Sequence, residues 1–217
     1  MFLTLALFAA AQPPADPRDA DRPARWEKEV AATEKRLKDA AVKPGGVVFA
    51  GSSSIRFWDL KKSFPGADYA NAGFGGSEIR DSTHAAARLV TPWQPKAVVF
   101  YAGDNDIANN RTAEQVAADF RAFCAAVHEA APKCRVLFVA VKPSILRWKR
   151  FDVQQKANAK VKEFCATDPR LAFVDIVPLM LGTDGKPVPE LFAKDGLHLS
   201  AAGYEKWTAA VAAALAK

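Results

Sequence analysis

Short apolar runs alternate with amphipathic stretches along most of the chain. Consecutive apolar residues are typical of buried strands, whereas apolar residues at helical spacing indicate helices. Strands are predicted over residues 47–49, 68–71, 97–101, 135–141 and 171–176. Helices are predicted over residues 24–41, from residue 77, from residue 113, over 153–164 and over 200–215.

The order of these elements predicts the fold class. Strands that are apolar throughout and alternate with helices form a parallel sheet covered on both faces. The simplest arrangement is an α/β fold: a flavodoxin-like three-layer α/β/α sandwich with a five-stranded parallel sheet. Half of the 217 residues are apolar, which suits a single domain that we place at residues 24–217.

The N-terminal residues differ from the rest of the chain. Residues 1–11 are uncharged and run from large apolar side chains into alanines, as a secretory signal does, although no Lys or Arg precedes them. Residues 12–23, with several prolines and alternating charges, predict a flexible spacer. We therefore expect a secreted or periplasmic protein. No apolar run reaches the roughly 18 residues of a membrane-spanning helix, so we expect no stable membrane anchor in the mature chain.

Charge and cysteine content argue against nucleic-acid binding and against a disulfide or zinc scaffold. The formal net charge of +6 is spread along the chain without a basic block. The cysteines, Cys124, Cys134 and Cys165, are too few and too far apart for a disulfide framework or a zinc site. We expect small buried side chains, with one disulfide as the alternative if the protein is exported.

Polar and glycine-rich motifs follow the first three predicted strands. Gly51 permits a tight turn, and Ser52–Ser54 opens a helix whose free N–H groups can stabilise negative charge. Gly75 and Gly76 follow the second strand, and Asn105 follows the third. Because ligands bind outside the carboxyl ends of strands in open parallel sheets, we expect these motifs to share one edge. Each motif alone is also compatible with a plain turn.

Asp195 and His198 lie in the loop before the last predicted helix. Across a glycine turn the carboxylate can fold back onto the imidazole, and such a pair is a base for a serine proton. The alternative is a turn in which Asp195 only caps backbone N–H groups. The Asn105 amide and the backbone N–H groups of Gly76 and Ser53 could donate to an oxyanion. Together the motifs supply a nucleophile, oxyanion donors, an acid and a base.

These motifs resemble the four conserved blocks of the SGNH hydrolases, also called GDSL-type esterases and lipases. The matching segments are Gly51–Ser54, Gly76 with the residues before it, Gly103–Asp106 and Asp195–His198. The resemblance implies the SGNH hydrolase fold, with Ser53, Asp195 and His198 as a catalytic triad. It implies an oxyanion hole made by Ser53, Gly76 and Asn105. It also implies a small-molecule ester substrate, no metal and no cofactor.

The first motif departs from the family at one position. The family usually has Asp before the serine nucleophile, where this chain has Ser52. We expect different local hydrogen bonding but the same chemistry, because that Asp is not the triad acid. Residue chemistry alone does not choose among Ser52, Ser53 and Ser54, and the register of the family points to Ser53.

Aromatic and basic residues near the motifs are candidates for substrate binding. Phe57, Phe74 and Trp148 could wall a small pocket, and without an inserted lid in the sequence we expect a short acyl group. A basic stretch follows the fourth strand and could border the cleft and favour an acidic substrate, although a solvated loop is the expected reading. Its members are Lys142, Arg147, Lys149 and Arg150.

Three further polar residues are expected to have structural or surface roles. Asp175, at a strand end, is expected to accept a structural hydrogen bond. His84 and His128 are expected to lie on helices without a catalytic role.

Two classes of function are compatible with the motifs. The first is a serine ester hydrolase that works through an acyl-enzyme, with carbohydrate acetylesterase and lysophospholipase as versions of it. The second is a non-catalytic module that binds an anion or a glycan at the glycine-rich edge. Only the hydrolase has a use for Asp195 and His198 as a pair.

Overall fold

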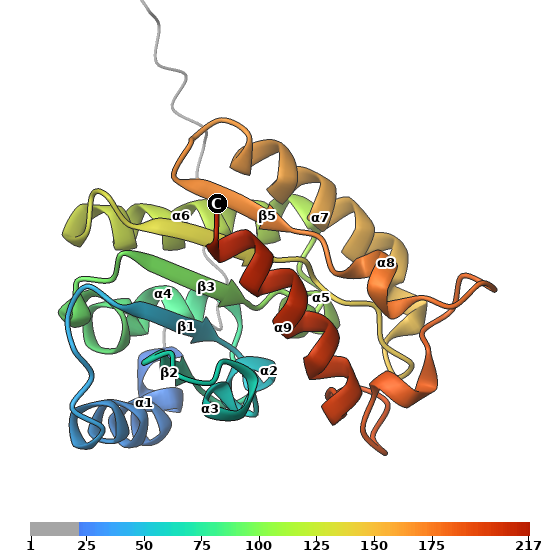
Figure 1. The fold of residues 1–217 in the computed structure, drawn as a ribbon. Coiled ribbons are helices and arrows are strands. Elements are labelled where there is room, and N and C mark those ends of the chain that lie inside the picture. The colour runs from blue at the N-terminus through green and yellow to red at the C-terminus, as the bar shows by residue number, and fades with distance from the viewer. Residues whose placement is uncertain (1–21) are drawn as a thin grey trace, which may run out of the picture.

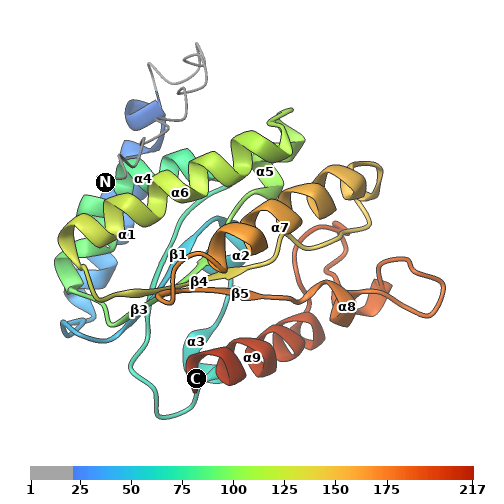
Figure 2. The same cartoon turned by 90° about the horizontal axis from the view of Figure 1, so that it is seen from above.

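The computed structural model describes residues 22–217, which form a three-layer α/β/α sandwich around a parallel sheet (Figures 1 and 2). The sheet has five strands in the order β2-β1-β3-β4-β5, and every pair of neighbours is parallel. The strands are β1 (Val47–Gly51), β2 (Ala70–Gly73), β3 (Ala97–Tyr101), β4 (Arg135–Val139) and β5 (Leu171–Val174). The predicted fold class is therefore confirmed.

Long helices cover both faces of the sheet, and short helices join them to the strands. The longer helices are α1 (Arg22–Asp39), α4 (Ile79–Leu89), α6 (Ala113–Ala130), α7 (Phe151–Cys165) and α9 (Ala201–Leu215). The shorter α-helices are α2 (Ser53–Arg56), α3 (Leu60–Ser63), α5 (Asp104–Ala108) and α8 (Val177–Met180). The described residues also form the 3₁₀ turns η2 (Thr91–Trp93), η3 (Trp148–Arg150) and η4 (Pro189–Leu191).

The sheet separates two apolar cores. On one face α1, α4, α6 and α7 pack against alternate residues of the strands, with Phe100, Phe120 and Phe123 among the buried side chains. On the other face α2, α3 and α9 enclose a second core that contains Trp58 and Trp207. Figure 2 shows α1, α4, α6 and α7 on one side of the sheet and α3 and α9 on the other. Because both faces are covered, the central strands β1 and β3 are buried along their whole length, as the sequence pattern required.

The observed elements differ from the predicted ones mainly at their ends. The helix predicted from residue 113 has the expected capping box between Thr112 and Gln115. The fourth strand stops at Val139 rather than at Val141, because the side chain of Asn158 donates to and accepts from the Val141 backbone in place of a neighbouring strand.

The first helix begins inside the segment that was predicted as a spacer. Helix α1 starts at Arg22, whose buried guanidinium pairs with Glu78 at 3.1 Å and with Asp81 at 2.9 Å. The spacer prediction is therefore wrong for Arg22 and Pro23, which belong to α1. The predicted signal segment and the rest of the spacer lie outside the described residues and stay predictions.

The cysteines behave as the sequence predicts. Cys124, Cys134 and Cys165 are buried and form no disulfide, and burial raises the pKa of the Cys134 thiol to about 11. Within residues 22–217, no helix has the length and apolar character needed to cross a membrane.

Three backbone segments approach one another at Gly51. They are β1 itself, the end of β3, and the loop that follows β2. The φ of Gly51 is +129°, and a Cβ there would lie 1.9 Å from the carbonyl oxygen of Tyr101. The Gly51 carbonyl accepts from the N–H of Phe74 at 3.1 Å, and the next N–H, of Ser52, donates to Tyr101 at 2.9 Å. A side chain at position 51 would therefore push three segments apart.

Gly51→Ala tests this constraint. We expect the unfolding free energy to fall by about 3 kcal/mol or more, since backbone strain and steric overlap add together. The control is Gly66→Ala, where φ is also positive (+81°) but no atom lies within 4 Å of the new Cβ. That variant should lose only about 1 to 2 kcal/mol. Urea unfolding followed by circular dichroism measures both, and equal losses would contradict the close-approach argument.

Candidate active site

The three consecutive serines after β1 have different environments. Ser52 is 1 % exposed, and its hydroxyl has no hydrogen-bond partner among the described residues. Ser54 is also buried, and its Oγ accepts from the ammonium of Lys142 at 3.3 Å. Ser53, the first residue of α2, is partly exposed. Its hydroxyl is therefore the one that both solvent and a catalytic base can reach.

Ser53, His198 and Asp195 form a continuous hydrogen-bonded chain. His198 Nε2 lies 3.0 Å from Ser53 Oγ, and His198 Nδ1 lies 2.6 Å from Asp195 Oδ2. The other carboxylate oxygen of Asp195 accepts from the backbone N–H groups of Leu197 and His198, both at 2.9 Å. The aspartate thus has both predicted roles, because it caps the turn and also holds the imidazole.

The charge state of Asp195 follows from these contacts. The hydrogen bond with His198, followed by that from the Leu197 N–H, lowers the pKa of Asp195 to about 2. The carboxylate is therefore ionised at neutral pH and can only accept hydrogen bonds. The proton between the two side chains consequently belongs to His198 Nδ1, which leaves Nε2 free to accept the proton of Ser53.

Gly76 and Asn105 lie close to each other, after the second and third strands. Asn105, at the start of α5, is 9 % exposed, and its Nδ2 donates to the carbonyl oxygen of Ser77 at 3.1 Å. A Cβ on the exposed Gly76 would lie 3.8 Å from that nitrogen, so no side chain separates the Gly76 backbone from the amide. The Asn105 amide nitrogen carries two N–H groups, and the bond to Ser77 uses one of them, so the second can donate to a ligand.

Lys142 and Arg147 are part of the site, which corrects the expectation of a solvated basic loop for these two residues. Lys149 and Arg150 are exposed, as expected. Arg147 donates to Asn105 Oδ1 at 2.8 Å and pairs with Asp104 Oδ2 at 3.1 Å. Lys142 is 1 % exposed and donates to Asp104 and to the Tyr101 hydroxyl, both at 3.0 Å. Burial would raise the pKa of Asp104, but the two cations outweigh it and lower that pKa.

The sequence contains one signal that could have identified the role of Lys142. Lys142 directly follows a run of buried apolar residues, at the same sheet edge as the other motifs. A lysine in that place must be paired, because an isolated buried ammonium is costly. Its partner Asp104 is the second residue of the motif after β3. The sequence analysis gives Asp104 no role of its own.

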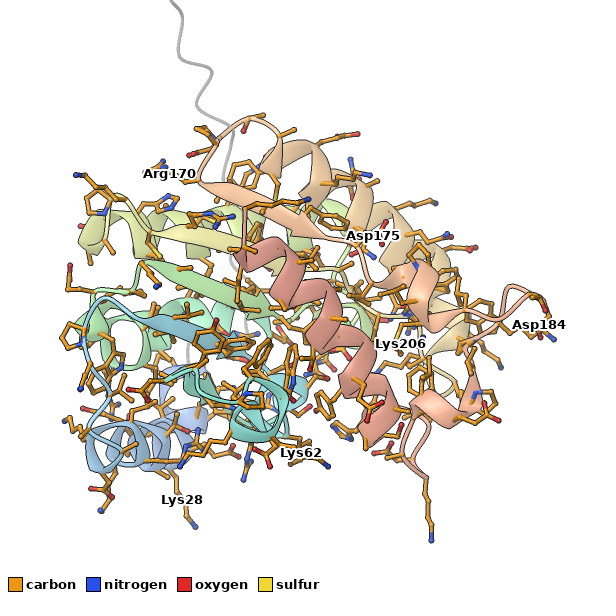
Figure 3. The ribbon with its side chains drawn as sticks, in the orientation of Figure 1. Lys28, Lys62, Arg170, Asp175, Asp184 and Lys206 are labelled. Atoms are coloured by element: carbon orange, nitrogen blue, oxygen red, sulfur yellow. The ribbon has the colours of Figure 1, made fainter. Side chains whose placement is uncertain are left out.

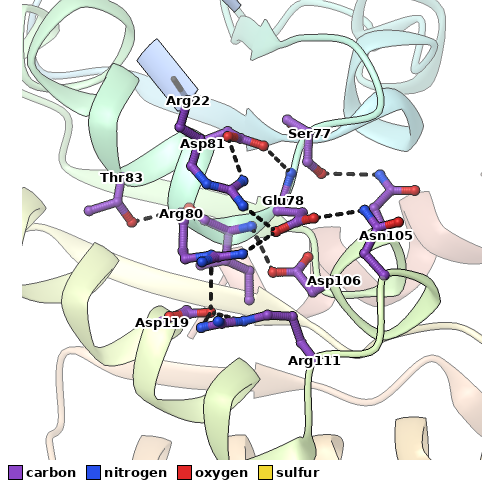
Figure 4. Close-up of polar contacts among 12 residues, drawn as sticks. Arg22, Ser77, Glu78, Arg80, Asp81, Thr83, Asn105, Asp106, Arg111 and Asp119 are labelled. Atoms are coloured by element: carbon purple, nitrogen blue, oxygen red, sulfur yellow. Dashed lines mark hydrogen bonds and ion pairs between the residues drawn. The ribbon is translucent and has the colours of Figure 1, made fainter. Parts of the chain in front are cut away.

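A buried ionic network holds the loop that carries Gly76. Figure 4 shows Glu78, at the start of α4, between the guanidinium groups of Arg22 and Arg80, while Asp81 pairs with Arg22. Glu78 also accepts from the side chain of Asn109 at 2.7 Å, which ties this loop to the end of α5. The loop after β2 and the helix after β3 are therefore joined by several hydrogen bonds.

Asp106 adds a further bond between the same two segments. Its Oδ1 accepts from the N–H of Ile79 at 3.1 Å, while Oδ2 has no partner among the described residues. Burial, and secondarily the charge of Glu78, raises the pKa of Asp106 to about 8. The carboxyl group is therefore mostly protonated at neutral pH.

The three predicted pocket aromatics have different positions. Phe57 is 54 % exposed, and its ring meets the His198 ring edge-to-face at a centroid distance of 5.0 Å. Phe74 is only 2 % exposed and packs against Trp26 of α1, so it cannot wall a pocket, and that prediction is wrong. Trp148 is half-buried and stacks on Phe151 within its own segment.

The remaining candidates lie apart from this chain of hydrogen bonds. Asp175, labelled in Figure 3 at the end of β5, accepts from the N–H of Val177 at 3.1 Å as a local cap. His84 is exposed on α4, and His128 on α6 contacts the Cys134 carbonyl oxygen at 3.0 Å. In the described part of the chain no group of three or more metal-binding side chains converges.

A serine–histidine–aspartate chain at the carboxyl edge of a five-stranded parallel sheet is the arrangement of an SGNH-type hydrolase fold. Residues 44–206 match the model of the GDSL-like Lipase/Acylhydrolase family, and the chain belongs to this family. No curated protein sequence matches the chain significantly.

Solved structures share the fold at low sequence identity. A Streptococcus pneumoniae protein provisionally named platelet activating factor has a TM-score of 0.77 and 18 % identity, covering 93 % of this chain and 100 % of its own. A GDSL-like lipase from Bacteroides thetaiotaomicron VPI-5482 has a TM-score of 0.70 and 20 % identity, with coverage of 87 % and 98 %. A carbohydrate esterase family 3 protein from Talaromyces cellulolyticus has a TM-score of 0.62 and 16 % identity, with coverage of 79 % and 96 %.

Asp106→Asn tests the protonation state of the buried carboxyl group. Between pH 3.8 and about 8, the unfolded chain is ionised at this position while the folded chain keeps its proton. The unfolding free energy of the wild type should therefore fall as the pH rises through this range, by on the order of 1 kcal/mol per unit. Asparagine keeps the Oδ1 acceptor and removes the titration.

Urea unfolding at several pH values between 4 and 9 measures this effect. We expect the unfolding free energy of Asp106→Asn to change less with pH than that of the wild type. At pH 8 the variant should have the larger unfolding free energy of the two. Asp184→Asn, on an exposed turn, is the control for losing one carboxylate. A variant profile as steep as that of the wild type would show that Asp106 is already ionised in the folded protein.

Proposed function

We propose that the protein is a serine ester hydrolase that cleaves small or short-chain carboxylic esters through an acyl-enzyme. The observation that carries this proposal is the continuous chain from Ser53 Oγ through His198 to Asp195, with distances of 3.0 and 2.6 Å. Its position at the carboxyl edge of the sheet places it where ligands reach this type of fold. Membership of the acylhydrolase family agrees with this chemistry.

The first half of the reaction forms the acyl-enzyme. Ser53 Oγ attacks the carbonyl carbon of the ester while His198 Nε2 takes the hydroxyl proton. Asp195, ionised and anchored by two backbone N–H groups, stabilises the imidazolium that forms. As the tetrahedral intermediate collapses, the bond from the carbonyl carbon to the alcohol oxygen breaks, and His198 gives its proton to the alcohol.

Three donors are placed to stabilise the oxyanion. They are the backbone N–H groups of Ser53 and Gly76 and the free N–H of Asn105. Arg147 and the Ser77 carbonyl hold the two ends of the Asn105 amide, so the amide cannot turn its oxygen toward the negative charge. One such donor contributes about 100- to 1000-fold in rate, because it is oriented before the reaction begins.

The second half of the reaction releases the acid. Water attacks the acyl carbon, His198 Nε2 takes a proton from that water, and the bond to Ser53 Oγ breaks as the proton returns to the serine. The same oxyanion donors serve both halves. The carboxylic acid leaves, and the enzyme regains its starting protonation state.

The alternative, a non-catalytic anion- or glycan-binding module, explains less of the site. Such a module would use the glycine-rich loops and the first turn of α2, but it would not need an ionised aspartate to orient a histidine onto a serine. Within the hydrolases, we favour an esterase acting on short acyl groups over a lysophospholipase. One of the proteins with this fold is named an acetyl esterase, which agrees with a short acyl group.

Ser53→Ala is the direct test of the nucleophile. We expect hydrolysis of p-nitrophenyl acetate to fall at least about 1000-fold, because Ser53 is the residue among those described whose hydroxyl is hydrogen-bonded to His198 Nε2. Ser52→Ala is the matched control, since its buried hydroxyl has no partner among the described residues, and it should stay within a few-fold of wild type. Rates on the acetate, butyrate and octanoate esters should decrease with acyl length. Equal activity of Ser53→Ala and wild type would overturn the proposed mechanism.

Arg147→Met tests whether the orientation of the Asn105 amide matters for catalysis. We expect kcat to fall about tenfold or more with a smaller change in KM, since the oxyanion forms only in the transition state. Arg150→Met is the control, because Arg150 lies in the same segment and donates to Asn110 at 2.9 Å, away from Asn105. A kcat within twofold of wild type would contradict a positioning role for Arg147.

A further inference from the structure

A groove lies between α3 and the C-terminal helix α9, next to the candidate active site. It has a volume of about 490 Å³ and is largely apolar. Phe57 and the residues after it form one wall, and the face of α9 that carries Ala201, Tyr204 and Ala209 forms the other. Figure 1 shows α2 and α3 beside the part of α9 that follows the His198 loop.

Two contacts join this groove to the catalytic residues. Phe57 lines the groove and also meets the His198 ring at 5.0 Å between centroids. Tyr204 lines the groove as well, and its hydroxyl donates to the backbone oxygen of Ser54 at 2.8 Å. The groove therefore ends at Phe57, whose ring lies between it and the imidazole of His198.

The mechanism determines which part of an ester would lie on the histidine side. His198 Nε2 must give its proton to the alcohol oxygen, so the alcohol group has to leave next to the imidazole. The oxyanion points toward Gly76 and Asn105, and the acyl group takes the remaining direction. A groove that starts at Phe57 is therefore placed for the alcohol part of the substrate.

The groove wall indicates the chemistry of that alcohol. Phe57 offers an exposed aromatic ring, and the small side chains of α9 leave room beside it. The charged residues of the groove are Asp59, Lys62 and Glu205, which sum to one negative charge and disfavour an anionic alcohol. Lys62 is labelled in Figure 3, on α3. An uncharged alcohol with a flat apolar ring face fits this combination.

We propose that the groove between α3 and α9 is the subsite for the alcohol part of the ester, an uncharged alcohol that carries a ring and places one face of it against Phe57. The inference rests on the proposed ester hydrolysis. An aryl alcohol and a sugar share this chemistry, since both present a flat face of C–H or aromatic carbon to an aromatic side chain.

The test varies the alcohol and keeps the acyl group constant. Release of acetate is measured from ethyl acetate, benzyl acetate and a methyl glucoside acetylated at its primary hydroxyl. Hydrolysis of ethyl hexanoate is measured as well, because it has the alcohol of ethyl acetate and a longer acyl group. The variant is Ala209→Trp, which fills the groove, and the control is Ala213→Trp, exposed on the same helix but outside the groove. For each ester, kcat/KM of the variant is divided by kcat/KM of the wild type, which removes differences in the intrinsic reactivity of the esters.

We expect Ala209→Trp to lower kcat/KM on at least one ring-bearing acetate about tenfold while ethyl acetate changes less than twofold, and Ala213→Trp to change neither. A loss on benzyl acetate alone identifies an aryl alcohol, and a loss on the acetylated sugar alone identifies a glycosyl alcohol. A loss that affects only ethyl hexanoate would place the acyl group in the groove and overturn the proposal. Equal losses on all esters, or none, would also overturn it.

A binding measurement separates this proposal from the proposed function. Ser53→Ala is titrated with benzyl acetate and with the acetylated glucoside by calorimetry, and the titrations are repeated with Ala209→Trp added. We expect the filled groove to weaken binding about tenfold for the ligand that uses it. If the wild type cleaves no ester, the hydrolase fails, while this loss of binding would still support the groove. Unchanged binding, or no binding before the groove is filled, would overturn the subsite.

Discussion

The close approach of backbone segments at Gly51 is the constraint on which the site depends. With no side chain at this position, β1 can lie against the Tyr101 carbonyl while its own carbonyl accepts from the loop that leads to Gly76. The strand ends that carry Ser53, Gly76 and Asn105 are thereby held together by backbone hydrogen bonds. These three residues thus extend from strand ends that backbone hydrogen bonds hold in place, which would preorganise the proposed oxyanion site.

Buried charge orients the polar groups around this junction. Asp104 sits between the cations of Lys142 and Arg147, which in turn reach Ser54 and Asn105. Taking these charges out of water is costly, and their mutual contacts offset that cost only in this arrangement. The network therefore fixes the direction of the Asn105 amide more than it adds to stability.

Two carboxyl groups near the site have opposite protonation states because their surroundings differ. Asp195 is partly exposed and accepts hydrogen bonds from the imidazole and two backbone N–H groups, so its pKa falls to about 2. Asp106 is buried near Glu78, and burial raises its pKa to about 8. The first can stabilise an imidazolium at neutral pH, while the second serves as a neutral link between the loop after β2 and helix α5.

The sequence by itself determined the parallel sheet, its two covered faces and the edge where the motifs meet, because apolar periodicity and turn residues are local properties. It also predicted Asp195 and His198 as a pair, which the short loop between them allows. Only the tertiary structure decided which serine faces the histidine, since Ser52, Ser53 and Ser54 differ in burial and partners and not in chemistry. Burial of Phe74 by Trp26, and of Lys142 by Asp104 and Tyr101, likewise depends on residues far away in the chain. The environment of a side chain is set by the elements packed against it, and a local pattern does not contain them.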